Sequence, residues 1–144
     1  MENEPEIFIT FFLAMIGYAG LTITLLFSLK SKIPVFFWRL ITIIIFVHVI
    51  MVWTYSYDWQ FAHSVRNGYS GFIIFHSALL VILISNMVKD STTKILIIIS
   101  YIVVTTGAVG AVFRYSVVEI YRIPVLFFML TGAGGLLFHY LKKN

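Results

Sequence analysis

Two histidines lie in the most apolar parts of this chain. His48 stands in FVHVIMVW (residues 46–53), and His76 stands in SGFIIFHSALL (residues 70–80). An unpaired polar side chain in hydrocarbon is costly, so an ionisable residue there indicates a functional site with a partner. Haem iron accepts two neutral imidazoles, one from each side of the porphyrin. The pair therefore predicts a haem with His48 and His76 as its axial ligands.

The two histidines are expected at similar depths in a membrane. Each lies somewhat outward of the middle of its apolar segment, residues 35–57 for His48 and residues 70–88 for His76. At about 1.5 Å of rise per residue, the rings come to nearly the same level on antiparallel helices. The short connection between the segments keeps those helices adjacent. The rings can then face one another, although helix rotation is not determined by the sequence.

Cations are available on the side toward which both histidines are displaced. The carboxylates of a haem placed there would point outward and need basic partners. Arg66 lies in the outer connection, Arg114 lies at the outer end of the fourth apolar segment, and Arg122 is a third candidate. We expect Arg66 and Arg114 near the propionates. His139 lies close to the opposite end and is expected to be an interfacial hydrogen-bonding group.

Two other interpretations of the histidines stay open. A histidine in a membrane bundle can simply bond a serine, a threonine or a backbone carbonyl on the next helix, without a cofactor. A copper or zinc site is the second alternative, since His48 and Met51 share a helix face and His63 and Asp58 lie in the outer connection. Imidazole and thioether ligands together suit a soft copper ion.

The composition defines the elements that must position these residues. Of the 144 residues, 60% are apolar and 11% are charged, outside the range of soluble domains. The fold class expected is all-α, a polytopic transmembrane helical bundle forming one domain over residues 1–144. Its spans are expected at residues 7–29, 35–57, 70–88, 95–113 and 123–141. The fifth is short and glycine-rich, so four spans plus a short terminal segment is the alternative.

The charges predict the orientation of the chain. In a five-span arrangement one side receives Lys30, Lys32, Arg39, Lys89, Lys94, Lys142 and Lys143. The other receives Glu2, Glu4, Glu6, Asp58, Glu119 and three arginines. The positive-inside rule places the N-terminus outside and the C-terminus in the cytoplasm. The net charge of +4 then reflects lysines that meet anionic lipid, and no nucleic-acid partner is expected. Richness in isoleucine and lysine is typical of an AT-rich prokaryotic genome. We therefore expect the membrane to be a prokaryotic cytoplasmic membrane.

Several kinds of chemistry are excluded by the residues present. The sequence has no cysteine, which excludes disulfides, thiolate metal sites, iron–sulfur clusters and covalent haem attachment. Asp58, Asp90 and Glu119 all lie between the apolar segments, so a carboxylate proton relay is not expected. No nucleotide-binding motif or activated nucleophile is present. We expect that the chain is not an enzyme on its own.

Residues 46–88 resemble the small membrane-bound cytochrome b proteins. FVHVIMVW and SGFIIFHSALL carry the resemblance: a histidine in one apolar helix, a short outer connection and a histidine in the next. It covers about a third of the chain. Many such proteins carry two haems and four helix histidines, but the first and fourth segments here have none. The resemblance therefore implies an electron-transfer subunit with at most one b-type haem between the second and third spans, and a quinone or a redox protein as its partner.

A second function of a different class is also expected from the composition. Small residues are abundant and exposed loops are few, as in chains that mainly bind other helices and lipid. The chain would then be a non-catalytic accessory subunit of a larger membrane complex, such as a respiratory oxidase or a membrane monooxygenase. It would contact other membrane subunits and the lipid bilayer and hold no cofactor.

Overall fold

The protein is a bundle of helices. The computed structural model describes residues 4–30, 33–66 and 68–142, so Glu2, Lys32 and Lys143 lie outside the described residues. Over those ranges every regular element is helical, which confirms the all-α prediction. In chain order the elements are α1 (Glu4–Lys30), α2 (Val35–Met51), a π-helical turn η1 (Val52–Ser56), α3 (Phe61–Ser64), α4 (Tyr69–Ser85), α5 (Asp90–Arg114), a 3₁₀ helix η2 (Ser116–Tyr121) and α6 (Arg122–Leu141).

Four helical stretches of the described chain are long and apolar enough to cross a membrane. They are Pro5–Lys30, Val35–Ser56, Ser91–Arg114 and Ser116–Leu141. The remaining apolar helix is α4, whose 17 residues extend about 25 Å at a rise of ~1.5 Å per residue. The third predicted segment thus forms the shortest apolar helical stretch, because α2, also of 17 residues, continues into η1. The fifth, expected to be weakest, forms the 20-residue α6. The prediction of an integral membrane protein agrees with these lengths.

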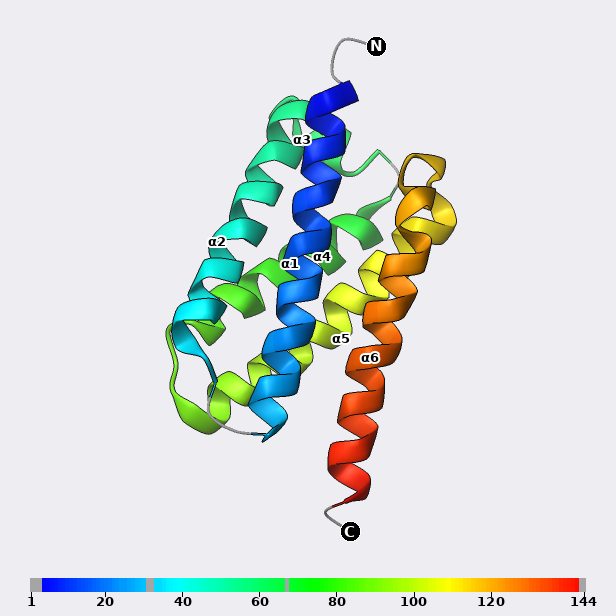
Figure 1. The fold of residues 1–144 in the computed structure, drawn as a ribbon. Coiled ribbons are helices and arrows are strands. Elements are labelled where there is room, and N and C mark those ends of the chain that lie inside the picture. Colours follow the sequence, from blue (N-terminus) through cyan, green and yellow to red (C-terminus); the bar gives the residue numbers. More distant parts are fainter. Residues whose placement is uncertain (1–3, 31–32, 67, 143–144) are drawn as a thin grey trace.

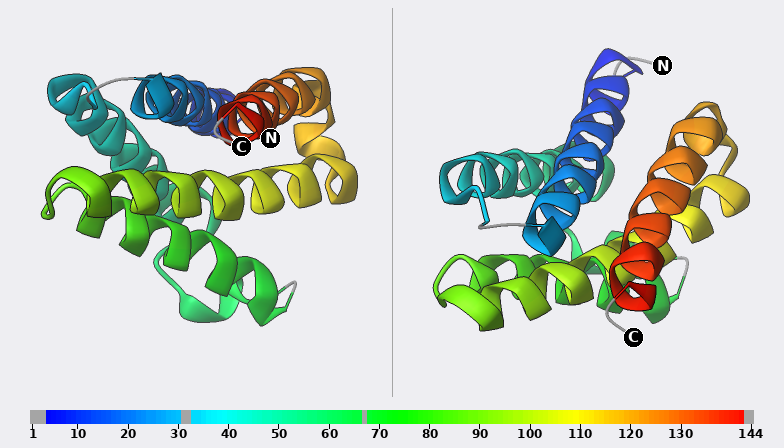
Figure 2. Two further views of the ribbon diagram at one scale, coloured as in Figure 1. Left: turned by 90° about the horizontal axis from the view of Figure 1, so that it is seen from below. Right: turned by 60° about the horizontal axis from the view of Figure 1, so that its bottom comes forward.

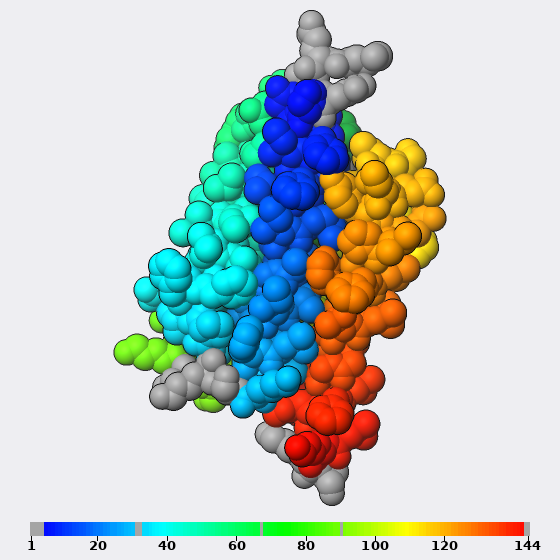
Figure 3. Space-filling view, viewed as in Figure 1, coloured from blue at the N-terminus to red at the C-terminus, as the bar shows by residue number. Residues whose placement is uncertain are grey.

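The helices are arranged around α1, which touches most of the others. α1 packs between α2 and α6 along one face of the molecule (Figure 3). Seen from below, α1 and α6 lie side by side and α5 crosses beneath them, with α4 on its far side (Figure 2). α4 packs extensively on α5 and touches α2 much less. The described N-terminal and C-terminal helix ends lie at opposite ends of the bundle (Figure 1). α2 and α4 are therefore close neighbours only over part of their lengths.

A glycine allows the closest approach between α1 and α2. A Cβ atom built on Gly20 would lie 2.6 Å from Ile41 Cγ1, inside van der Waals contact. Beside this contact are Leu21, Leu25 and Trp38, which are among the most buried side chains of the core. Small residues let membrane helices approach closely, and dispersion contacts along such a seam stabilise the pair. Gly20, in the first predicted span, therefore allows α1 and α2 to pack closely at this point.

Two side-chain hydrogen bonds join α2 to the end of α4. The Trp38 indole N–H donates to Ser85 Oγ at 2.9 Å, and both side chains are buried. Asn86, directly after α4, donates from Nδ2 to Thr42 Oγ1 at 2.8 Å. Polar bonds between membrane helices contribute roughly 0.6–2 kcal/mol each. These two hydrogen bonds hold α2 and α4 together at the end of the bundle opposite α3.

We expect Trp38→Phe to lower the free energy of unfolding by about 1–2 kcal/mol. The change removes the indole donor and part of a buried ring, while Ser85 keeps its own bond to the Ile82 carbonyl at 2.6 Å. Thermal unfolding of the purified chain in a mild detergent measures the effect. Trp59→Phe is the control, because Trp59 is 64% exposed. Equal losses in both variants would contradict the assigned role of Trp38.

The charges segregate to the two ends of the bundle. The end formed by the C-terminal ends of α1 and α6 carries basic residues, among them Lys30 and Lys142. The opposite end carries Asp58, Glu119, Arg66, Arg114 and Arg122, on or beside the connections after η1 and α5. This separation is what the sequence predicted from the five apolar segments.

Candidate functional site

A cavity of about 380 Å³ lies between α2, η1, α4 and α5, with α1 and η2 contributing to its wall. Small-molecule sites usually measure about 300–1,000 Å³. Most of the lining is apolar, including Phe72, Phe75 and Val112. All four residues that the sequence singled out for a cofactor line this one cavity: His48, Arg66, His76 and Arg114.

His48 is held by the first helix. Its Nδ1 donates to the backbone carbonyl of Thr10, on α1, at 2.8 Å. Because a carbonyl oxygen can only accept, the proton of the neutral ring lies on Nδ1 and Nε2 keeps its lone pair. Thr10 is itself 2% exposed and bonds its hydroxyl to the Glu6 carbonyl at 2.7 Å. The imidazole is thus oriented by a buried partner on a neighbouring helix.

His76 has the same tautomer but different neighbours. Its Nδ1 donates to the Phe72 carbonyl, one turn earlier on α4, at 2.8 Å, and its ring stacks on that of Phe72 with 4.0 Å between centroids. Its Nε2 accepts a hydrogen bond from the Trp53 indole at 3.2 Å. The structure therefore brings both histidines to one cavity, while each ring bonds a different part of the protein.

Trp53 is the centre of an aromatic cluster above His76. Its ring meets those of Tyr57 and Trp59 at centroid distances of 5.6 and 5.9 Å. It lies in η1, a π-helical turn, and such turns occur often at functional sites. Asp58 and Trp59 follow with φ angles of 51° and 55°, a left-handed conformation that is unusual for a residue as bulky as tryptophan. This backbone turns the Trp59 ring back onto Trp53.

Polar groups gather at the α3 end of the cavity. Arg66, Arg114 and His63 line it there, and His63 Nδ1 donates to the Tyr57 carbonyl at 3.0 Å. The Tyr57 phenol also lines the cavity and lies near the Arg66 guanidinium. Arg114 lies over the Tyr115 ring, 5.5 Å from its centroid. This end therefore offers cations and a protonated phenol to a ligand.

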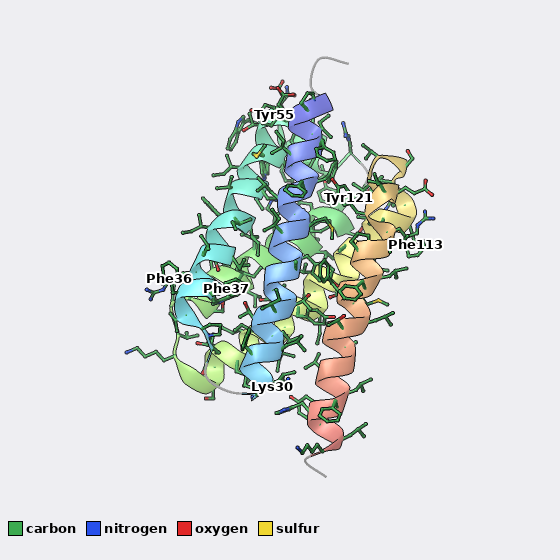
Figure 4. The ribbon with its side chains drawn as sticks, in the orientation of Figure 1. Lys30, Phe36, Phe37, Tyr55, Phe113 and Tyr121 are labelled. Carbon is green, nitrogen blue, oxygen red and sulfur yellow. The ribbon has the colours of Figure 1, made fainter. Side chains whose placement is uncertain are left out.

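Arg122, the third cation considered from the sequence, is engaged elsewhere. Its guanidinium pairs with Glu119 at 3.1 Å and lies 4.9 Å from the centroid of the Phe113 ring. It does not line the cavity, although its neighbour Tyr121 does. Tyr121, labelled in Figure 4, lies between α1 and the start of α6, and its ring is 6.4 Å from that of Phe11. Its buried hydroxyl has no hydrogen-bond partner among the described residues.

The residues considered for copper are dispersed. His63 bonds Tyr57, and the Asp58 carboxylate accepts from Gln60 Nε2 at 3.4 Å. Met51 is absent from the cavity lining. Across the part of the chain that the structure describes, no three histidine, aspartate or glutamate side chains form a metal-ligand group. His139 lies in the last turn of α6, far along the chain from these residues and in a separate groove.

Trp53, Tyr57 and Tyr121 are not among the site residues that the sequence predicts. The structure adds that all three line the cavity, and that Trp53 bonds a predicted ligand. The spacing of five residues from His48 to Trp53 did not indicate that both belong to one site, because an ordinary helix places such residues on different sides. Only the π-helical turn, which changes the rotation after Met51, brings Trp53 to His76.

Comparisons of the chain with protein-family models, with curated proteins and with solved structures found no match. A proposal for the function is accordingly built on the cavity and its lining residues. The relevant features are two histidines that each donate from Nδ1 to a backbone carbonyl, apolar walls and cations at one end.

Proposed function

We propose that this membrane protein binds one b-type haem in the cavity between α2 and α4 and acts in electron transfer. One observation carries the proposal: His48 and His76 come from different helices, line the same apolar cavity, and both direct Nδ1–H to a backbone carbonyl. This arrangement fixes the tautomer in which Nε2 is the ligand atom and raises the basicity of the ring. It is the state that an axial haem ligand requires.

The remaining lining residues fit the same group. Phe75, Val104 and Ala108 offer apolar walls for a porphyrin, and Arg66 and Arg114 line the end of the cavity where its carboxylates would lie. The Tyr121 hydroxyl, which bonds none of the described residues, is a further hydrogen-bonding group for a ligand. When bound, haem supplies one-electron chemistry; the protein supplies ligands, orientation and a dry environment.

One contact has to change for His76 to ligate iron. Its Nε2 now accepts the Trp53 N–H at 3.2 Å, and the same lone pair cannot serve both partners. Trp53 belongs to the π-helical turn, and its indole is held by ring contacts and by this one side-chain hydrogen bond. We therefore assign Trp53 as the side chain that moves when His76 becomes a ligand.

The proposed setting is a prokaryotic cytoplasmic membrane that the chain crosses five times, with the N-terminus outside. The basic end formed by α1 and α6 supports this orientation, and α4 would be the shortest span. A span shorter than the hydrocarbon is accommodated by local thinning of the bilayer. The cavity then lies toward the outer side, where a quinone or a redox protein is the proposed electron partner.

A visible spectrum of the purified full chain tests the proposal. After expression with haem precursor supplied, we expect a Soret band, a sharp α band on reduction and about one haem per chain. Metal analysis of the same sample separates iron from copper, which is the alternative metal. A chain without these bands, also after titration with hemin, would overturn the proposal and leave the accessory subunit as the function.

A further inference from the structure

A second hollow lies at the other end of the molecule, between the C-terminal ends of α1 and α6. It is a groove of about 560 Å³ and shares no lining residue with the cavity around the histidines. Figure 4 labels Lys30, at the end of α1 that borders this groove. The described residues that line it are Leu26, Leu29, Lys30, Gly135, Phe138, His139 and Lys142.

The floor of the groove is apolar and set by a close helix contact. A Cβ atom on Gly135 would collide with the Leu26 side chain, so α1 and α6 touch at this level. Leu29 is almost fully buried beside it, at 6% exposure, whereas Phe138 is 69% exposed. The groove therefore presents an apolar surface that the described residues leave partly exposed, of the kind that an acyl chain contacts.

The rim of the groove is basic. Lys30 stands in the last turn of α1, His139 stands in the last turn of α6, and Lys142 follows directly. Of the described residues that line the groove, none is acidic. The acidic side chains that the structure describes are Glu6, in the first turns of α1, Asp58, after η1, and Glu119, in η2, and all three lie toward the opposite end of the bundle. The rim thus complements a negatively charged group.

We propose that this groove binds an anionic phospholipid, with its phosphate at Lys30 and Lys142 and an acyl chain along Leu26, Leu29 and Phe138. Cations above an apolar wall, at the level where membrane helices end, match the two halves of such a lipid. Basic pockets between helices on the cytoplasmic side of a membrane recognise lipid headgroups in this way. Each lysine near the surface contributes roughly fivefold to the affinity. The two together are expected to contribute about 25-fold.

Native mass spectrometry of the full chain in neutral detergent tests this site. Phosphatidylglycerol, phosphatidylcholine and inorganic phosphate are the three probes. We expect phosphatidylglycerol to bind with a clear preference over phosphatidylcholine, and Lys30→Gln/Lys142→Gln to weaken its binding about 25-fold. The matched control is Lys89→Gln/Lys94→Gln, which removes the same charge near the α4–α5 connection. Neither pair contributes to the helix core, and circular dichroism checks that both variants keep their helix content.

Three results would overturn the proposal. The first is an unchanged affinity for phosphatidylglycerol in Lys30→Gln/Lys142→Gln. The second is an equal loss in Lys89→Gln/Lys94→Gln, which would assign the effect to diffuse surface charge. The third is complete displacement of the lipid by an equal concentration of inorganic phosphate, since the apolar wall would then contribute nothing to binding.

Discussion

Replacing either His48 or His76 with alanine is expected to abolish the sharp α band of the reduced protein and to weaken haem retention at least tenfold. Each change removes one axial imidazole, and iron loses the field that produces the low-spin spectrum. Even loss of a group that only orients a metal ligand costs about 10–100-fold in affinity. The absorption spectrum and the haem content per purified chain measure the effect.

Two comparisons separate ligation from general damage to the fold. His139→Ala should keep the wild-type spectrum, because His139 lies in the last turn of α6 and borders the other groove. Added imidazole should restore the α band of His76→Ala, since truncation leaves room for the small molecule beside Phe72. If His48→Ala and His76→Ala both retained a wild-type spectrum, other groups would be the ligands. The role of His48 would then be limited to its hydrogen bond from α2 to the Thr10 carbonyl on α1.

The lengths of the apolar segments and the positions of the charges were sufficient to predict the helices. The reason is that a segment in a membrane must form all its backbone hydrogen bonds within itself. The end of the third segment was wrong by a few residues for a tertiary reason. Met87 and Val88 are apolar and extend the run, yet α4 ends at Ser85. Asn86 donates to the Ile82 carbonyl at 2.9 Å and to Thr42, on α2, at 2.8 Å. A bond to a distant helix cannot be read from local composition.

The sequence predicts similar depths for His48 and His76 from residue counts, but it does not predict the rotation of their helices. In the structure both rings line one cavity. Their hydrogen-bond partners depend on the rotation of each helix about its own axis. η1 changes that rotation after Met51, where the sequence predicts an uninterrupted helix over residues 35–57. The contact between Trp53 and His76 therefore had no signal in the sequence.

Glycines show the same limit. From the sequence, Gly132 and Gly134 are equivalent: both stand in the fifth apolar segment and serve either a flat cofactor or close packing. In the structure a Cβ atom on Gly132 would overlap the Tyr101 ring, whereas one on Gly134 meets no atom within 4 Å. Two residues correspond to about 200° around a helix, so one glycine faces α5 and the other faces outward.

Gly132→Ala is expected to lower the free energy of unfolding by about 2 kcal/mol, within the usual range of about 1–3 kcal/mol for an overpacked core. The added methyl group would collide with the end of the Tyr101 side chain. That ring cannot simply move aside, because its hydroxyl donates to the Phe128 and Met129 carbonyls at 3.0 and 2.8 Å. Tyr101 also stacks on Tyr18, with 6.2 Å between centroids. Unfolding of the purified chain, followed by circular dichroism in mixed micelles, measures the loss.

Gly134→Ala is the matched control, and it should be neutral or stabilising by up to about 1 kcal/mol, since alanine favours a helix where space allows. Tyr101→Phe on the Gly132→Ala background separates the two causes of the loss. Without its hydroxyl the Tyr101 ring is free to shift away from the added methyl group, so part of the lost stability should return. In the wild-type background the same change should only lower stability, because it removes a bonded hydroxyl. Equal stabilities for Gly132→Ala and Gly134→Ala would show that α5 and α6 do not pack through Tyr101.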